Sequence, residues 1–414
     1  MNANSTIGLP GTGNYDHCLI ASCLKKLFAP ASKNADEPVL KVHKKVSAVR
    51  KELERLNSAD VPELSFGYLD GMERSVGGAA FRYAVIFRDN APVLFAYFQL
   101  FTLTSQNFRM EKNKGFVKGI FRFFLHLKNI RLLISGNALR NETLCYCYDE
   151  SILSKEAATE IIASAAEKIA GDEGAAAVIL KDIPRSPKTK KWLERIGYRM
   201  PWEDKVMTLH IDPKWESLTG YIDALSRKYK TRARKILADG GGLSVRQMTK
   251  SDIAGHKETI NRLFKNVADN QSFVLASPTD DHFGMLKNIY KNDFEVQGFF
   301  AGEELIAFSS AFISDDGYEL YYVGFDYKNN GVYQLYFNIL FSGLERALKL
   351  GKKELKLGRT SFDAKASIGA KAADNEYLIK MVHIPAVVSK WFMNYFSSME
   401  DAKWKLRNPL KQLA

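Results

Sequence analysis

The second half of the chain alternates apolar and polar positions in short segments bounded by turn residues. FEVQGFFAGEELIAFSSAFIS (294–314) predicts two strands joined by a Gly-Glu-Glu turn, and YELYYVGFD (318–326) predicts a third strand. YQLYFNILFSGLERALKLG (333–351) has helical spacing of its apolar residues and ends at a glycine. KKELKLGRT (352–360) then predicts a further strand. This half is therefore expected to run strand, strand, strand, helix, strand.

The first half predicts the same series. FRYAVIFRDNAPVLFAYFQLFTL (81–103) reads as a two-stranded hairpin, and ETLCYCYDE (142–150) corresponds to the third strand. SKEAATEIIASAAEKIAG (154–171) corresponds to the helix and AAAVILKDIP (175–184) to the strand after it. The hairpin and third strand are further apart here, which predicts an insertion of about 37 residues near 104–141. Two mixed α/β units in tandem are the simplest architecture.

A basic amphipathic helix is predicted between the halves, at 221–238. Six of the nine residues from Arg227 to Lys235 are basic. The apolar residues of this stretch fall on one stripe at about 100° per residue, and the basic residues lie outside it. Gly240, Gly241 and Gly242 follow as a stop and a domain boundary. We expect this helix to brace the two units, with its charges beside a cleft that meets anions.

Composition narrows the function classes. The 414 residues carry a formal net charge of +12 and are 46% hydrophobic, which fits two or three folded domains and an anionic partner. Cys145 and Cys147 would share one face of a strand, and the four cysteines of the chain do not form the two pairs of a zinc site. We therefore expect a protein of a reducing compartment, with no disulfide framework and no metal.

The element order resembles that of the GNAT acyltransferase fold, and the tandem arrangement is similar to the FemAB-like group of N-acyltransferases. YLDGMERSVGGAAFRYAVIFRD, YIDALSRKYKTRARK and YYVGFDYKNNGVYQLYFNILFSGLERALKLGKKELKLGR carry the resemblance, which covers about residues 60–395. It implies an α/β fold class with mixed sheets and two tandem GNAT-like units. It also implies transfer of an acyl group to an amine, with the first unit degenerate and the second active.

In this family the donor pyrophosphate lies at the loop that enters the helix after the third strand, where helical N–H groups favour an anion. The family motif is Gln/Arg-x-x-Gly-x-Gly/Ala. The corresponding residues, which the resemblance implies as donor-binding, are Lys328, Asn329, Asn330, Gly331, Tyr333 and Gln334. Tyr333 replaces the last small residue of the motif, and an ordinary turn before a helix would have a similar sequence. The first half has DESILSKEA at this place, without a glycine.

Amide formation from a thioester needs a polarised carbonyl, a deprotonated amine and alignment of the two. Asp326 or Glu319 is the candidate base, or the anchor of an ammonium group, and capping or surface roles are the alternatives. Tyr322 is the candidate proton donor to the departing thiolate, or else a half-buried aromatic of the sheet. Alternation along 318–326 would place Tyr318, Tyr322 and Asp326 on one face.

GRTSFDAKASIGAK (358–371) follows the last strand and resembles a Gly-rich, Lys-bearing segment of the FemAB-like group. Arg359, Thr360 and Lys365 are therefore candidates for binding a substrate carboxylate or phosphate, and solvent-facing charge is the alternative for Arg359 and Lys365. His282 and His383 are isolated in sequence and are interpreted as ordinary helix or strand residues.

The insertion contains NKGFVKGIFRFFLHLKNIRLLI (113–134), in which Lys114, Lys118 and Arg122 recur every four residues among phenylalanines. This pattern is typical of a helix that contacts a membrane surface or lipid, and a helix covering a core face is the alternative. It favours a lipid-like acceptor or a long acyl donor. No stretch of 18 apolar residues exists, so we expect a cytoplasmic protein with peripheral contact to the inner membrane surface.

Together these patterns predict an acyltransferase that uses acyl-CoA or an acyl carrier protein as co-substrate, binds no permanent cofactor, and acylates a lipid-like or amino-acid-like amine. Two alternatives stay open: a Fem-like transferase that uses aminoacyl-tRNA in peptidoglycan synthesis, and a non-catalytic lipid- or membrane-binding protein. Outside the tRNA alternative, a nucleic acid partner is not expected. The predicted division of the chain is 1–50 (N-terminal segment), 51–215 (first unit), 216–242 (linking helix) and 243–414 (second unit).

Overall fold

The computed structural model describes residues 38–57, 60–107, 130–184, 186–200, 204–271, 273–279, 281–375, 377–382 and 405–411. The helices of the first half and the linking region are α2 Arg50–Leu56, α3 Phe66–Ser75, α5 Lys155–Glu173, α6 Pro187–Arg195, α7 Leu218–Ala224 and α8 Arg227–Asp239. Those of the second half are α9 Lys250–Gly255, α10 Lys257–Ala268, α11 His282–Tyr290, α12 Tyr327–Tyr333, α13 Leu335–Lys349 and α14 Phe362–Ser367. Short 3₁₀ turns η1 to η5 cover Val46–Val49, Pro62–Leu64, Ser105–Asn107, Gly240–Gly242 and Lys291–Asp293.

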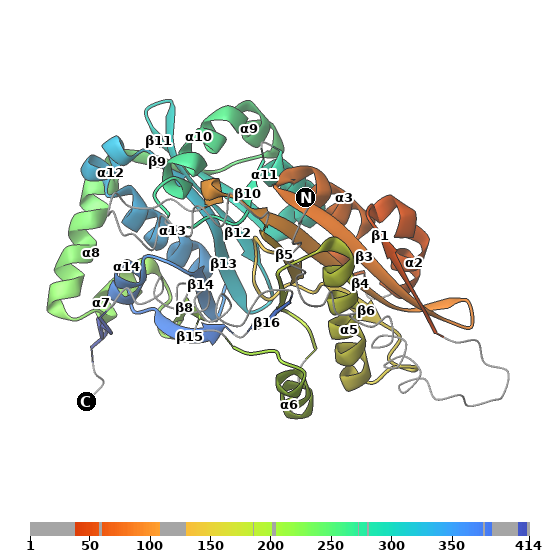
Figure 1. Ribbon diagram of the computed structural model, residues 1–414. Coiled ribbons are helices and arrows are strands. Elements are labelled where there is room, and N and C mark those ends of the chain that lie inside the picture. Colours follow the sequence, from red (N-terminus) through yellow and green to blue (C-terminus); the bar gives the residue numbers. More distant parts are fainter. Residues whose placement is uncertain are drawn as a thin grey trace, which may run out of the picture.

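Most of the strands belong to two large mixed sheets (Figure 1). The first half contributes β1 Val39–His43, β2 Val76–Gly77, β3 Ala79–Arg88, β4 Ala91–Leu103, β5 Ile130–Ser135, β6 Tyr146–Tyr148, β7 Ala177–Leu180 and β8 Asp204–His210. The second half contributes β9 Leu243–Gln247, β10 Ser277–Pro278, β11 Phe294–Ala301, β12 Glu304–Ile313, β13 Gly317–Phe325, β14 Glu354–Gly358, β15 Lys371–Asn375 and β16 Leu378–Met381.

Local sequence explains several boundaries of these elements. Asp89 and Asn90, both at positive φ, close the tight turn between β3 and β4, a conformation that Asp and Asn tolerate. Ser154 caps α5 by accepting from the Ala157 N–H, and the helix ends at Gly174 in the left-handed region. These boundaries follow the patterns from which the elements were predicted.

The two halves exchange one strand each. The first sheet has the order β1-β3-β4-β5-β7-β16 and the second has β15-β8-β14-β13-β12-β11-β9. β8 belongs to the first half in sequence but pairs antiparallel with β14 of the second, while β16 of the second half pairs antiparallel with β7 of the first. A small ladder of β2 with β10 joins the halves again. The sheets therefore do not follow the predicted ranges 51–215 and 243–414 throughout, and β1 adds part of 1–50 to the first sheet.

The third strand of the first unit is β5 and not the predicted segment 142–150, which contains only the short β6 off the main order of the sheet. Ile130–Ser135, assigned from sequence to the insertion and to the end of its helix, is strand β5 and pairs with Phe98–Leu103 of β4. The short β6 pairs further along the same strand, with Leu94–Ala96. A short apolar run is compatible with either a strand or a helix. Here it forms a strand because it can pair with the edge of β4. The rest of the predicted insertion helix falls within 108–129, outside the described residues.

The predicted linking helix is divided in two. Leu225 is extended, so α7 ends at Ala224 and α8 begins at Arg227. The segment 405–411 lies against this break, where the Ser226 N–H donates to the Pro409 carbonyl and the Lys411 N–H donates to the Ala224 carbonyl. The backbone groups of Ala224 and Ser226, which an unbroken helix would pair internally, thus form hydrogen bonds with a distant segment instead. The apolar stripe of the two helices packs on α13 in a cluster built from the second sheet and its helices, so the expected packing between the two units is not what this cluster shows.

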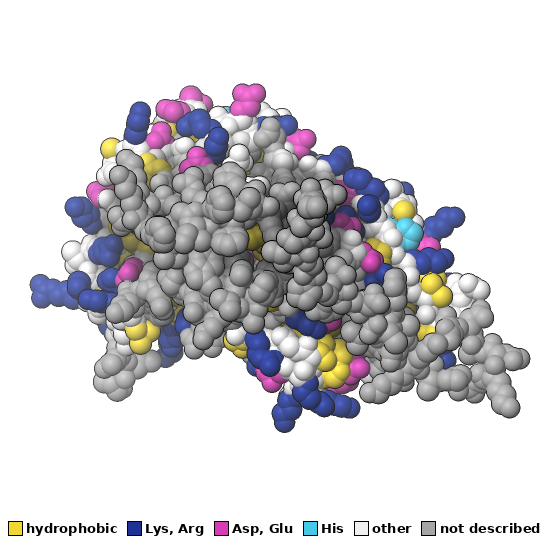
Figure 2. Space-filling model, viewed as in Figure 1, with side chains coloured by type: hydrophobic (Ala, Val, Ile, Leu, Met, Phe, Trp, Pro, Cys, Tyr) yellow, Lys and Arg dark blue, Asp and Glu magenta, His cyan; other side chains and the backbone are white. Residues whose placement is uncertain are grey.

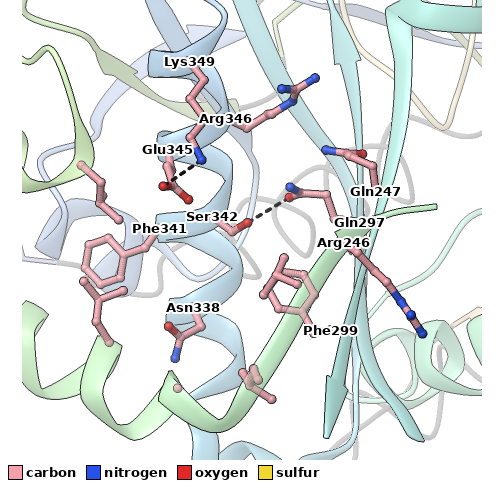
Figure 3. Close-up of a pocket in the computed structure, with 15 residues that line it drawn as sticks. Arg246, Gln247, Gln297, Phe299, Asn338, Phe341, Ser342, Glu345, Arg346 and Lys349 are labelled. Atoms are coloured by element: carbon pink, nitrogen blue, oxygen red, sulfur yellow. Dashed lines mark hydrogen bonds and ion pairs between the residues drawn. The ribbon is translucent and has the colours of Figure 1, made fainter. Parts of the chain in front are cut away.

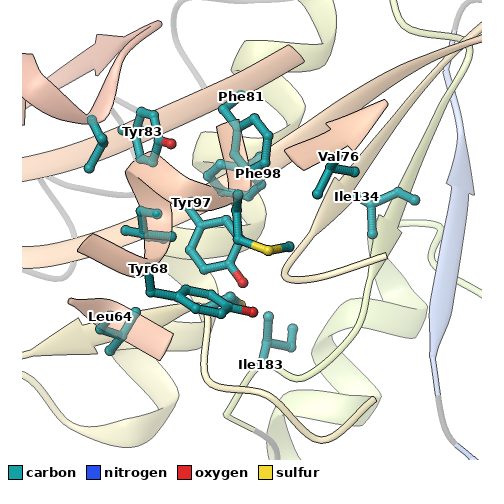
Figure 4. Packing of buried hydrophobic residues seen from close by; sticks show 14 of the residues in the cluster. Leu64, Tyr68, Val76, Phe81, Tyr83, Tyr97, Phe98, Ile134 and Ile183 are labelled. Carbon is teal, nitrogen blue, oxygen red and sulfur yellow. The ribbon is translucent and has the colours of Figure 1, made fainter. Parts of the chain in front are cut away.

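Helices cover both faces of the second sheet. α10 and α11 pack on one face of it, and α13 packs on the other with α7 and α8 outside it. Apolar packing continues from the first unit into the second through one cluster that includes Tyr68 of α3 and Phe312 of β12. Figure 4 shows the part of this cluster around Tyr68 and Tyr97. The structure thus has the two mixed α/β units in tandem that the sequence predicts.

Candidate active site

A β-bulge on β13 is the feature from which the site is built. Ala311 of β12 faces Leu320 and Ser309 faces Val323, so Ser310 opposes both Tyr321 and Tyr322. The Ser310 hydroxyl holds the bulge, because it donates to the Tyr322 carbonyl (3.0 Å) and accepts from the Tyr322 N–H (3.1 Å). The bulge is therefore fixed by a side chain of the neighbouring strand.

The bulge places Tyr321 and Tyr322 on the same face, with ring centroids 4.3 Å apart. Both rings lie toward α10 and α11, where Tyr322 contacts Phe264 and Phe283. Tyr318 points to the other face, toward Glu295 and α13. The predicted grouping of Tyr318 with Tyr322 is therefore wrong, because the extra residue of the bulge shifts the alternation of side chains by one position.

β13 and β14 stop pairing just before the bulge. They pair in parallel from Gly317–Glu319 to Glu354–Lys356; β13 then continues along β12 to Phe325, while β14 ends at Gly358. The Asp326 N–H donates to the Ile306 carbonyl, so the N–H of Asp326 is directed toward β12. Because N–H groups alternate along a strand, the N–H groups of Val323 and Phe325 point to the side where β14 no longer pairs.

Gly324, between those two residues, allows α10 to approach β13 closely. A Cβ at this position would lie 2.5 Å from the backbone nitrogen of Phe264 and 2.6 Å from the Leu263 carbonyl carbon. Any side chain here would force α10 away from the sheet. The glycine therefore helps to keep the α10 face tightly packed behind the two tyrosines.

The loop after β14 is strained and is held by a buried lysine. Gly358, Thr360 and Ser361 have φ values of 65°, 64° and 50°, a conformation that costs a β-branched residue such as Thr about 1–3 kcal/mol. The Lys365 ammonium donates to the carbonyls of Gly358 (3.3 Å) and Arg359. Lys365 is 3% exposed, and burial lowers its pKa to about 7. The solvent-facing alternative for Lys365 is therefore wrong.

Arg359 and Thr360, the other predicted substrate residues, lie on the exposed part of this loop. Arg359 donates to Asn141 Oδ1 of the first unit (3.2 Å). The adjacent strand makes a second contact of this kind, because Lys356 of β14 pairs with Glu142 (2.5 Å). The loop after β14 therefore lies against the segment 136–145 of the first unit.

The three predicted catalytic residues do not converge on one point. Asp326 caps α12 by accepting from the Lys328 N–H (2.8 Å), and Glu319 accepts from the Arg140 guanidinium of the first unit. Tyr322 lies beside the bulge, where burial raises its pKa and the charge of Arg359 opposes that shift. Tyr322 is therefore placed at the divergence of β13 and β14, whereas both carboxylates are engaged in structural contacts.

Arg140 is a residue of this region that sequence interpretation missed. Its guanidinium bonds Glu319 (2.9 Å) and Glu63 (3.0 Å) and lies 3.6 Å from the centre of the Phe312 ring. Arg140 thus connects its own segment to Glu63 and to the Phe312–Glu319 region, which are all far apart in sequence. No periodicity or motif marks Arg140, so only the packing of the two units could have revealed it.

A second contact between the units runs through His282. Its Nδ1 lies 3.0 Å from the Ser75 hydroxyl of α3, and its Nε2 lies 3.0 Å from the Tyr321 hydroxyl. His282 has no exposed surface, and burial lowers its pKa to about 3, so the ring is neutral near pH 7. It lies in α11, as an ordinary helix residue was expected to, and it connects α3 to the bulge. His383 lies outside the described residues.

The predicted phosphate loop is helical. Lys328, Asn329, Asn330, Gly331 and Tyr333 belong to α12, and Gln334 is the left-handed residue between α12 and α13. The Asn330 N–H donates to the Asp326 carbonyl, and the Gln334 N–H donates to the Asn330 carbonyl. A loop was expected here, but Asp326 provides a cap and α12 forms. Two N–H groups that could have bound a pyrophosphate are therefore bonded inside the helix.

A cavity of about 300 Å³ lies elsewhere, between α13, α8 and the strands β9 and β11 (Figure 3). Its polar side chains bond one another: Ser342 donates to Gln297 (3.1 Å), and Lys349 pairs with Glu345 (3.0 Å). β11 and β12 separate this cavity from the divergence of β13 and β14. None of the residues predicted from sequence lines it.

The described part of the chain contains no candidate metal site and no candidate membrane-spanning helix. Among the residues the structure describes, no group of three or more His, Cys, Asp or Glu side chains could hold a metal ion. No helix in that same part combines the length and apolar character needed to cross a bilayer. Burial raises the pKa of both the Cys145 and the Cys147 thiol, so neither is activated as a thiolate nucleophile.

Comparison with solved structures finds similar arrangements of elements in proteins of low sequence identity. FemX is 9% identical, with a TM-score of 0.48 over 86% of this chain and 100% of that one. A tandem GNAT protein from the clavulanic acid biosynthesis pathway is 10% identical, with a TM-score of 0.46 over 84% and 100%. A GCN5-related N-acetyltransferase from Kribbella flavida is 9% identical, with a TM-score of 0.45 over 85% and 73%. No family model and no curated protein matches the sequence.

Proposed function

We propose that the protein is an N-acyltransferase that moves an acyl group from a thioester to an amine. The observation that supports this most directly is the divergence of β13 and β14 beside the bulge. It directs the Val323 and Phe325 N–H groups to one side of β13, where they can donate to the carbonyl oxygen of a thioester. Such donors stabilise the negative charge that develops on that oxygen.

In the proposed reaction the amine nitrogen attacks the thioester carbonyl carbon, an amide bond forms and the carbon–sulfur bond breaks. The departing thiolate takes a proton from the Tyr322 hydroxyl, which stays protonated because burial raises its pKa. The proton released by the amine passes to water, since Asp326 and Glu319 are engaged by the cap of α12 and by Arg140, and water then returns a proton to Tyr322. These roles are proposals about the second unit.

The acceptor is proposed to be an amine on a lipid-like or amino-acid-like molecule. The Phe-rich basic sequence at 113–129 favours lipid character, and the loop Gly358–Ser361 with Arg359 would meet a carboxylate or phosphate of the acceptor. Peripheral contact with a membrane surface belongs to the same proposal.

Donor binding tests the function without knowledge of the acceptor. The melting temperature of the purified protein is measured with palmitoyl-pantetheine, acetyl-CoA, palmitoyl-CoA and CoA at matched concentrations. A rise with a thioester, well above that with CoA, is expected because a ligand of the folded state stabilises it. Tyr322→Phe should keep this rise and slow transfer to an amine acceptor. The absence of any rise with every small thioester, together with no binding of a palmitoyl-acyl carrier protein, would reject the proposal and favour a tRNA donor or a non-catalytic protein.

A further inference from the structure

A stripe of cations on α8 faces solvent beside the second unit. Lys228, Arg232 and Lys235 are exposed and lie on one side of the helix, because they are four and three residues apart. None of the three pairs with a carboxylate of the described residues, whereas Lys230 and Arg234 share Asp223. We call Lys228, Arg232 and Lys235 the basic ridge. In Figure 2 dark blue side chains project along the left edge, where Figure 1 places α8.

The basic ridge borders the end of the second unit where β13 and β14 diverge. The Arg232 guanidinium lies 4.7 Å from the centre of the Phe337 ring, in the first turn of α13. The adjacent Tyr336 lies near Ser361 of the loop after β14, whose side chain opposes the rise that burial gives to the pKa of Tyr336. Tyr229 of α8 lies near Arg407 and contributes to raising its pKa, and Arg407 pairs with Asp363 of α14 (2.9 Å). The ridge therefore lies next to the first turn of α13, whose Tyr336 lies near the loop after β14.

α12 adds exposed apolar surface next to the ridge. Val332 is 62% exposed and Tyr327 is 47% exposed, and Lys328 lies one turn before Val332 on the same side. α12 packs against α8. Apolar side chains surrounded by cations are typical of a protein–protein interface with an acidic partner, since such interfaces combine an apolar centre with a charged rim. A nucleic acid would use the cations but would gain little from Val332.

Two backbone donors that were expected to bind coenzyme A are already bonded. The N–H groups of Asn330 and Gln334, at the place expected to hold its pyrophosphate, are bonded within α12. A phosphopantetheine arm on a carrier protein has a single phosphodiester and no adenosine phosphates, so it needs no such cradle. Its affinity comes instead from the protein to which it is attached.

We propose that the basic ridge and α12 dock an acyl carrier protein, an acidic protein that delivers the acyl group on its phosphopantetheine arm. The proposal rests on the proposed function and names the donor for it. The docked protein would lie over α8 and the exposed side of α12, and its arm would enter beside Tyr336 toward the bulge. Attraction between the ridge and acidic helices would speed the encounter and weaken as salt is added.

The test measures binding of a fluorescently labelled palmitoyl-acyl carrier protein by anisotropy. Lys228→Glu/Lys235→Glu should weaken binding at least tenfold, and Val332→Glu should weaken it several-fold. The matched control is Lys188→Glu/Lys191→Glu on α6, which makes the same change in net charge at exposed positions distant from α8. The control should bind within twofold of the unaltered protein. Palmitoyl-pantetheine, which has no protein part, should stabilise all variants equally.

Other results would overturn the proposal in separate ways. If palmitoyl-pantetheine binds but the carrier protein binds no more tightly, the donor is a small thioester; the docking proposal then fails and the proposed function stands. Equal weakening by the ridge and control variants would mean that net charge alone attracts the partner, which also rejects docking. Ridge-dependent binding of tRNA without carrier protein binding would replace the partner by a nucleic acid. If no thioester binds in any form, both proposals fail.

Discussion

Arg140 donates two hydrogen bonds to the same oxygen of Glu319, across 179 residues of sequence. The pair joins the loop after β5 in the first unit to the start of β13 in the second. It fixes the first unit against the strand on which the candidate active site is built. The side chains are 13% and 24% exposed, so the pair is largely shielded from water.

Replacement of Arg140 by Met should destabilise the protein by about 3–5 kcal/mol, because Glu319 and Glu63 would keep their charges in a largely buried place without a partner. The free energy of unfolding from urea denaturation measures this. Glu319→Gln leaves an amide that can still accept from Arg140 and should cost clearly less. An equal loss in both variants would show that packing rather than charge holds the units here.

Ser310→Ala should loosen the bulge. The hydroxyl of Ser310 is buried and bonds both the N–H and the carbonyl of Tyr322, so its removal leaves two backbone groups without their partner. We expect a loss of about 1–3 kcal/mol in unfolding free energy and weaker stabilisation by thioesters. Ser309→Ala is the matched control, since its bond to Gln297 is long, at 3.5 Å. If Ser310→Ala binds thioesters as the unaltered protein does, the bulge does not form the donor site.

Because of His282, the free energy of unfolding should fall as the pH is lowered. Burial lowers its pKa from 6.5 to about 3, so the folded protein keeps the ring neutral where the unfolded chain protonates it. Between these pH values the unfolded state binds more protons. This contribution is therefore fully present above pH 6.5 and is lost as the pH falls, by up to about 1.4 kcal/mol per pH unit.

His282→Gln isolates this effect. The variant has no titrating group at the position, so its unfolding free energy should change less steeply between pH 4.5 and 6.5 than that of the unaltered protein. The carboxylates titrate in both proteins and cancel in the comparison. Equal slopes would mean that the ring is already charged in the folded state.

Gly331→Ala distinguishes a helix from a phosphate loop at 327–333. Gly331 has open space where a Cβ would lie and is helical in α12, so alanine should raise the unfolding free energy by about 0.5–1 kcal/mol. Thioester-induced stabilisation should not change. A marked loss of thioester binding would instead place phosphate against this glycine and restore the loop expected from sequence.

Local sequence patterns were sufficient to predict most of the strands and helices. The alternation in 294–326 predicts β11, β12 and β13, and the helical spacing with a terminal glycine predicts α13, because each element buries a face that its own sequence defines. Repetition of the same order in the first half predicts the tandem fold. These features depend on residues close together in the chain.

The candidate site was predicted less well, because its geometry depends on a neighbouring strand. Tyr322 was found from sequence, yet its orientation follows from the bulge that Ser310 holds. The six predicted donor residues were placed by resemblance in a loop, whereas capping by Asp326 makes them the helix α12 and its end. Arg140 and the Ser75–His282–Tyr321 contact had no sequence signal at all.

The sequence by itself determined which segments form strands and helices, that they repeat, and that α8 is basic on its outer side. Tertiary structure decided the exchange of β8 and β16 between the sheets, the break at Leu225 and the assignment of Ile130–Ser135 to the first sheet. The physical reason is that hydrophobic periodicity specifies which face of a segment is buried. The partner that covers that face, and the backbone groups that satisfy its edges, come from residues hundreds of positions away.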